Sequence, residues 1–319
     1  MPPFPYLDIF KKAYFLSIRN PWLWAFGFFI GGVGGINFGS FNFVFSPPRD
    51  REFQSLEQMG ANVSQWISSN TLMFALIAAA VFALAIVLVI FSGISKGAVI
   101  WSARKFGEKE PVGFKPSLRS ARKYMWRVIV LHSIVTLAYF VTLLVFVLPI
   151  TYLFSVGAAS RAVILSVIGF VIFIPASVVF SFMHLYGPIF VVLYDISLPA
   201  AVHHSFNLIR QKLKESILFA LYLFGFAILF IFGLGFSIIL AGVPLALFGW
   251  FMLSLGFGAG VNSLITGFIV LAVAYVIIMG SGFAVFQNIA WVLAVEEMIK
   301  TRKLPEKESK TVPAIEPVA

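Results

Sequence analysis

Long apolar runs, separated by short charged segments, divide this chain along its whole length. A bilayer core about 30 Å thick is crossed by about 20 apolar residues of α-helix. The chain is 60% hydrophobic and 11% charged, whereas soluble domains average about 45–50% apolar and about 25% charged residues. The sequence therefore predicts an all-α fold, a polytopic transmembrane bundle of about six spans, at residues 22–45, 71–94, 128–150, 162–194, 216–240 and 263–295.

The basic residues orient these spans. Lys and Arg are concentrated between Lys96 and Arg127, which we interpret as a loop between the second and third spans. Short loops rich in Lys and Arg stay on the cytoplasmic side of a membrane. With six spans, 20 of the 23 Lys and Arg residues lie on that side. We therefore expect both termini to be cytoplasmic.

The remaining composition excludes several kinds of function. A net charge of +10 is compatible with nucleic-acid binding, but the charges flank the spans and form no recognition module, so we expect no nucleic-acid partner. The chain has no Cys, which rules out disulfides and thiolate chemistry. No nucleotide-binding, serine-hydrolase or metalloprotease motif is present, so we expect no cofactor.

Residues 241–262 do not fit the six-span pattern. They are apolar, begin with Gly242, Val243 and Pro244, and end in a glycine-rich stretch before Asn262. They form either a re-entrant hairpin on the outer side or a seventh span. The hairpin is favoured because a seventh span would place the basic tail outside.

A pattern of interfacial amphipathic helices followed by transmembrane hairpins recurs along the chain. Apolar stripes at helical spacing precede the first, third and fifth spans: Leu7, Phe10, Tyr14 and Ile18; Leu118, Ala121, Met125 and Ile129; Val202, Phe206, Ile209 and Leu213. We predict one transmembrane domain, residues 1–295, with units at about 1–94, 112–193 and 196–295, followed by a cytoplasmic, partly disordered tail, 296–319. The alternative is three ordinary loop helices without a common origin.

Basic side chains on these helices are candidate contacts for anionic lipid headgroups, because each Lys or Arg near an anionic surface contributes about 1 kcal/mol. The candidates are Lys115, Arg119, Arg122, Lys123, Arg127, Arg210 and Lys212. Membrane lipids are therefore the expected partners, and a protein partner or a second copy of the chain remains an open alternative.

Glycines recur every four residues in the first predicted span, at Gly27, Gly31, Gly35 and Gly39. This spacing puts them on one helix face, where a second helix can approach closely. A helix-packing face is the favoured interpretation. The alternative is a locally broken helix that lines a polar cavity.

Ionisable residues within spans are candidate functional sites, and they are few. His184 lies between Pro175 and Pro188 and is the candidate intramembrane polar site, whereas His132 is expected to be structural. No carboxylate accompanies His184 within a span, so we assign no catalytic residue. Asp195, His203 and His204 lack the spacing of metal ligands on a helix, and no metal site is expected.

Short motifs in this chain are similar to those of a bacterial membrane-protein family. They are residues 19–24 (Arg-Asn-Pro-Trp-Leu-Trp), 188–195 (Pro-Ile-Phe-Val-Val-Leu-Tyr-Asp) and 200–208 (Ala-Ala-Val-His-His-Ser-Phe-Asn-Leu). The chain resembles the membrane domain attached to some glycerophosphoryl diester phosphodiesterases, and related six-span proteins. The resemblance implies a six-helix membrane fold in the bacterial inner membrane. The soluble catalytic domain of those enzymes has no counterpart here, so no catalytic residue carries over.

We therefore expect a non-catalytic integral membrane protein that acts as a scaffold or lipid-interacting module. A small-solute or lipid transporter is the alternative, with a path past the glycine face and His184.

Overall fold

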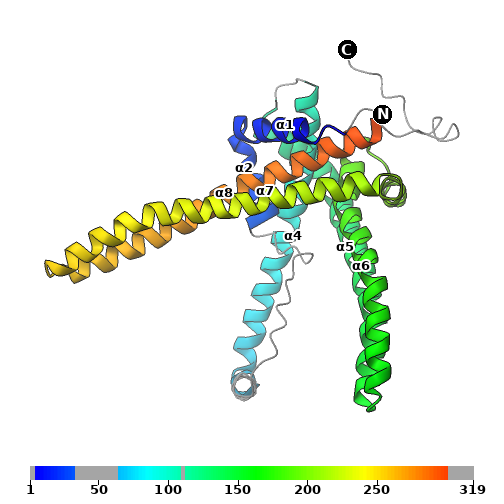
Figure 1. The fold of residues 1–319 in the computed structure, drawn as a ribbon, viewed down its shortest axis with the longest axis horizontal. Helices are drawn as coiled ribbons and strands as arrows, with labels where there is room; N and C mark the ends of the chain where they lie inside the picture. Colours follow the sequence, from blue (N-terminus) through cyan, green and yellow to red (C-terminus); the bar gives the residue numbers. More distant parts are fainter. Residues whose placement is uncertain (1–3, 33–63, 109–111, 301–319) are drawn as a thin grey trace.

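A computed structural model describes residues 4–32, 64–108 and 112–300, and the regular elements in these ranges are helices (Figure 1). Their order is α1 (Tyr6–Arg19), the short 3-10 helix η1 (Pro21–Leu23), α2 (Trp24–Gly27), the π-helical turn η2 (Phe28–Gly32), α4 (Thr71–Gly107), α5 (Phe114–Ser155), α6 (Ala159–Tyr194), α7 (Leu198–Ser254) and α8 (Gly258–Lys300).

The helices α4, α5, α6, α7 and α8 are each long and apolar enough to cross a membrane. Their most apolar 18-residue windows have mean hydropathy between 2.4 and 3.2, and at most 22% of each window is buried inside the protein. Apolar helices with so little protein around them need lipid as their solvent. The chain is thus a multi-pass membrane protein, and the all-α prediction is confirmed. The first predicted span, 22–45, is described only as far as Gly32.

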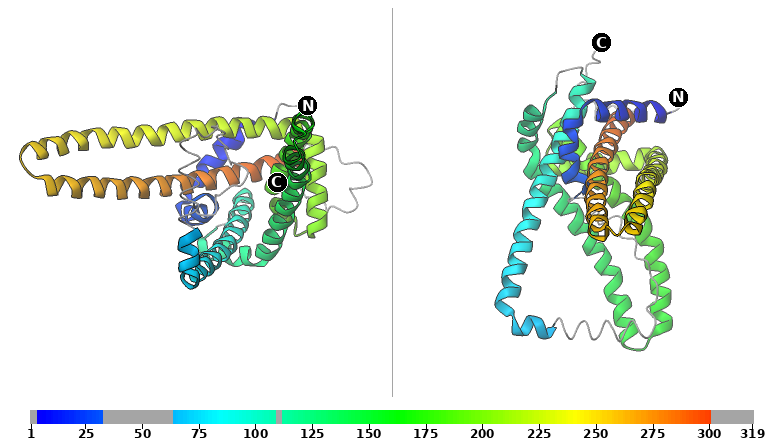
Figure 2. Two further views of the ribbon diagram at one scale, coloured as in Figure 1. Left: turned by 90° about the horizontal axis from the view of Figure 1, so that it is seen from below. Right: turned by 90° about the vertical axis from the view of Figure 1, so that its left-hand side faces the viewer.

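Three arms extend from a shared base (Figures 1 and 2). One arm is α4, the second is the α5–α6 hairpin, and the third is the α7–α8 hairpin, which leaves the base in a different direction. The buried side chains gather in the base, where α1, α2 and one end of each long helix meet. Most of the side chains farther out along the arms are exposed.

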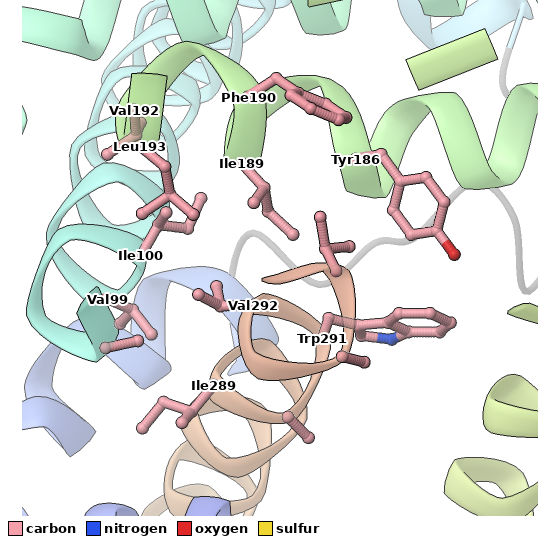
Figure 3. Close-up of a cluster of buried hydrophobic side chains, with 14 of the residues drawn as sticks. Val99, Ile100, Tyr186, Ile189, Phe190, Val192, Leu193, Ile289, Trp291 and Val292 are labelled. Carbon is pink, nitrogen blue, oxygen red and sulfur yellow. The ribbon is translucent and has the colours of Figure 1, made fainter. Parts of the chain in front are cut away.

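Aromatic and branched side chains from α4, α6 and α8 fill the centre of the base (Figure 3). Tyr186 of α6 is fully buried beside Trp291 of α8, with their ring centroids 5.8 Å apart. The Tyr186 hydroxyl donates a hydrogen bond to Ser216 Oγ at 2.7 Å, and Ser216 donates to the Lys212 carbonyl at the same distance. Lys212 has non-helical dihedral angles inside α7. This chain of hydrogen bonds therefore holds the kink at which α7 changes direction.

The segment interpreted as a basic loop is mostly helical. α4 continues to Gly107 and α5 begins at Phe114, so Lys96 lies within α4 and the connection covers only residues 108–113. The second predicted amphipathic segment, Leu118 to Ile129, is likewise the first part of α5 and is not a separate helix. In the other two units a break does set the segment off, at Asn20 after α1 and at Lys212 within α7.

Residues 241–262 are neither a re-entrant hairpin nor a seventh span. α7 continues through Pro244 to Ser254, the chain turns, and α8 begins at Gly258. The turn uses Gly256 at φ +86°, a left-handed conformation that glycine adopts without strain. These residues therefore form the tip of the α7–α8 hairpin.

Gly27 and Gly31 lie against α8. A Cβ added at Gly27 would lie 2.0 Å from the Ser281 carbonyl oxygen, and one added at Gly31 would lie 2.5 Å from the Ala284 Cβ. This face is thus a close helix contact, and the π-helical turn η2 interrupts the helix directly beside it. Gly35 and Gly39 lie outside the described residues.

We expect Gly27→Ala to destabilise the base, because the new methyl group would meet backbone, which cannot move aside as a side chain would. Overpacking of this kind costs about 1–3 kcal/mol or more. Gly233→Ala on α7 is the matched control, since an added Cβ there meets nothing within 4 Å. The thermal unfolding midpoints of the two purified variants in detergent measure their stabilities. Equal midpoints for the two variants would contradict the close contact.

Candidate functional site

An exposed basic stripe runs along the first part of α5. Lys115, Arg119, Arg122 and Trp126 follow one another at spacings of four, three and four residues, which places them on one face of the helix. All four side chains are exposed, and Trp126 is 62% exposed. The opposite face buries Ser117, Ala121 and Val128 in the base. We call Lys115, Arg119, Arg122 and Trp126 the basic stripe.

Two further basic residues of α5 have an acidic partner. Lys123 Nζ and Arg127 donate hydrogen bonds to the two carboxylate oxygens of Asp195, each at 2.7 Å. Asp195 follows α6 directly and has φ +50°, so its side chain turns back towards α5. The hydrogen bond from Lys123, with a further one from Arg127, lowers the pKa of the Asp195 carboxyl. Lys123, Arg127 and Asp195 therefore tie the ends of α5 and α6 together.

The remaining predicted headgroup contacts also include one residue with an acidic partner and one without. Lys212 is half-buried at the α7 kink and lies 3.4 Å from a Glu215 carboxylate oxygen. Arg210 is exposed on the segment before the kink. Within the described ranges, Lys115, Arg119, Arg122 and Arg210 have no ion pair. They are the members of the predicted set that are free to contact lipid.

α1 presents three different faces. Ile9, Phe10, Ala13 and Ser17 are buried, and the Ser17 hydroxyl donates a hydrogen bond to the Gly282 carbonyl of α8 at 3.2 Å. Leu7, Tyr14 and Ile18, three members of the predicted apolar stripe, are exposed. The basic residues Lys12 and Arg19 are exposed on the third face, whereas Lys11 is exposed within the apolar stripe, four residues after Leu7 and three before Tyr14. A helix with free apolar and basic faces suits the boundary between headgroups and acyl chains.

His184 lies in a cluster of basic groups next to the buried side chains of the base. Its ring centroid is 3.7 Å from that of His132 on α5, and His132 Nε2 is 2.6 Å from Lys96 Nζ on α4. Sequence reasoning selected His184 but assigned Lys96 to a loop. The sequence feature that indicates a helix through Lys96 is the absence of any proline between the second span and Gly107. The cluster therefore joins the first two arms.

A small cavity of about 10 Å³ adjoins this cluster, lined by Lys96 and His184 and by Asn288 and Trp291 of α8, among others. Such a volume holds about one water molecule. A larger open cavity, of about 260 Å³, lies between the start of α1 and the end of α8, where Asp8, Lys12, Glu296, Glu297 and Lys300 line it.

Residues considered as metal ligands are engaged in other contacts. Asp195 pairs with α5, and His203 Nε2 lies 2.9 Å from the Asn207 side-chain nitrogen, one turn along α7. In the part of the chain that the structure describes, no three His, Asp or Glu side chains gather as a metal site.

We expect Asp195→Asn to weaken the connection between α5 and α6 without straining the backbone, because Asn tolerates a positive φ. Each exposed ion pair contributes about 0.2–1 kcal/mol. The lowered pKa of Asp195 means that this contribution is present above the ordinary carboxyl pKa, about 3.9, and is lost as the pH falls through the folded-state pKa. Unfolding midpoints measured between about pH 6 and 2 should therefore converge for the two proteins at the acid end. A constant difference would show that the charge of Asp195 is irrelevant.

The three motifs that resemble the phosphodiesterase membrane domain all lie in the base. They cover the break between α1 and α2, the end of α6 and the start of α7. Residues 188–193 are buried throughout, so this motif belongs to the packed centre, whereas the other two motifs include exposed residues such as Arg19 and His203. Comparison with protein-family models, curated proteins and solved structures gave no match for the chain.

Proposed function

We propose that this chain is a non-catalytic membrane protein of the bacterial inner membrane that binds anionic lipid headgroups through its base. Both termini would then lie on the cytoplasmic side, with α4 and the α5–α6 hairpin crossing the bilayer. The α7–α8 hairpin, which leaves the base in a different direction (Figure 1), would cross it after swinging parallel to them. A role as a scaffold follows from the same geometry, since a base held at the membrane surface presents its outer side to the cytoplasm. The proposal includes a relationship to the membrane domain of the glycerophosphoryl diester phosphodiesterases.

The basic stripe is the observation that carries this proposal. Its three cations are exposed and without an acidic partner among the described residues, while the adjacent Lys123 and Arg127 are held by Asp195. Trp126 lies among them, and tryptophan is enriched at headgroup depth in membrane proteins. Three cations at an anionic surface contribute about 3 kcal/mol together, and this contribution weakens with added salt.

The exposed apolar face of α1 supports the same placement. Leu7, Tyr14 and Ile18 face away from the protein, on a helix that also exposes Lys11 and Arg19. Burial of such a face in the interface stabilises it by about 25 cal/mol for each Å² of apolar surface removed from water. Together with the basic stripe, α1 would hold the base at the level of the headgroups.

A small-solute or lipid transporter is the alternative, and the Lys96, His132 and His184 cluster is the observation that favours it. The cavity beside this cluster holds about one water. The glycine face of the predicted path is occupied by α8 at Gly27 and Gly31. Transport along this route would therefore require a second conformation in which α2 and α8 separate.

The test compares single charge removals at the two ends of the protein. Arg119→Gln removes a cation of the basic stripe, and Arg161→Gln removes an exposed cation near the α5–α6 tip. We expect Arg119→Gln, but not Arg161→Gln, to lower the retention of phosphatidylglycerol in native mass spectrometry, by about fivefold for about 1 kcal/mol. The triple variant Lys115→Gln, Arg119→Gln, Arg122→Gln should lose it almost completely.

Retention of phosphatidylethanolamine serves as the control for general lipid binding, because this headgroup carries no net charge. The retention of phosphatidylethanolamine should be the same in the wild type, the two single variants and the triple variant. Unchanged phosphatidylglycerol retention in the triple variant would contradict the proposal, and an equal loss in Arg161→Gln would show that the effect is not specific to the base.

A further inference from the structure

Lys96, His132 and His184 bring three basic groups together without an acid. The contact between Lys96 Nζ and His132 Nε2 is 2.6 Å, and the two imidazole rings lie 3.7 Å apart between centroids. Within the described ranges, none of the three has an ion pair with a carboxylate. The three helices that carry them, α4, α5 and α6, pack on one another at this level.

A lysine ammonium in this position needs a negative partner. Transfer of an unpaired charge from water into an apolar environment is strongly unfavourable, and neighbouring histidines supply no negative charge. Lys96 lies in the part of α4 that packs in the base, where the neighbouring Ser95, Gly97 and Ala98 are buried in the protein. Either the lysine gives up its proton, or an anion binds beside it.

The contact with His132 leaves the charge of Lys96 in place. A protonated Lys96 donates its hydrogen bond to His132 Nε2, which puts the imidazole proton on Nδ1, beside the Val128 backbone one turn earlier on α5. His132 is then neutral, and it positions the ammonium group without neutralising its charge.

The cavity limits the size of an anion that could bind beside Lys96. Lys96 and His184 line it from two arms, and Asn288 and Trp291 line it from α8. Its volume of about 10 Å³ corresponds to about one water-sized particle. A phosphate or carboxylate group is larger than this, whereas a single halide ion is comparable in size to a water molecule.

We propose that Lys96 and His184 bind one halide ion, chloride under cellular conditions, in this cavity between α4, α6 and α8. His132 is a positioning residue that fixes the lysine. The ion would neutralise Lys96 and connect α4 to the other two arms near the base. This site uses none of the residues of the basic stripe, so halide binding and lipid binding can be tested separately.

The experiment uses the full chain in detergent, with gluconate as the reference anion at constant ionic strength. Replacement of gluconate by chloride or bromide should raise the thermal unfolding midpoint, and the effect should saturate. Chloride-35 NMR provides a direct readout, because chloride exchanging with a protein site shows a broadened line. We expect bromide to reverse the broadening by competition.

Substitutions then locate the site. Lys96→Gln should lower halide affinity about tenfold or more, because it removes a charge-assisted hydrogen bond. His184→Gln should weaken it less, and Lys96→Arg should retain it because the charge remains. Arg161→Gln, which changes an exposed cation near the α5–α6 tip, is the control and should bind halide as the wild type does.

If Lys96→Gln does not fold, the comparison of His184→Gln with Arg161→Gln decides the question by the NMR line width. The proposal is overturned if the wild type shows neither halide-dependent stability nor chloride broadening. It is also overturned if phosphate stabilises the protein and halides do not, or if His184→Gln and Lys96→Gln both bind halide normally.

Discussion

The packing of one end of each long helix into a common base is the interaction on which the rest of this structure depends. Gly27 and Gly31 let α2 approach α8, and Tyr186, Trp291 and their neighbours fill the space between α6 and α8. In the most apolar 18-residue window of each long helix, at most 22% is buried inside the protein. Lipid is as apolar as these side chains, so close packing in the base, through small residues and fitted aromatic side chains, determines the arrangement.

The basic residues near the base serve two purposes, because some form ion pairs that hold the base together and others stay exposed at its surface. Asp195 uses its left-handed backbone to turn towards α5, where it holds Lys123 and Arg127. Lys115, Arg119 and Arg122 lie on the next face and keep their charges exposed. A single basic helix segment thus contributes to the stability of the base and, in the function we propose, to its contact with lipid. The two sets differ by only about one third of a helical turn, since consecutive residues lie about 100° apart.

The features predicted correctly from the sequence are those set by composition and local pattern. Apolar length indicated the long helices, and glycine spacing indicated a close helix contact at Gly27 and Gly31. The role of Lys96 could not be predicted, because it depends on His132 and His184, which come from other helices. The pairing of Asp195 with two of the seven candidate lipid contacts depends in the same way on a contact across more than 60 residues. The helical tip at 241–262 was missed because Pro244 and the glycines were read as breakers, although a long apolar helix tolerates them.

The central claim, that the base lies at the cytoplasmic surface and the arm tips lie on the other side, can be tested by cysteine labelling. The chain has no Cys, so each introduced cysteine is unique. Arg119→Cys reports on the base, while Ser155→Cys and Ser254→Cys report on the tips of the two hairpins. The account predicts that a membrane-impermeant maleimide labels the two tips in intact cells and Arg119→Cys only in inverted membrane vesicles. Labelling of all three from the same side would contradict it.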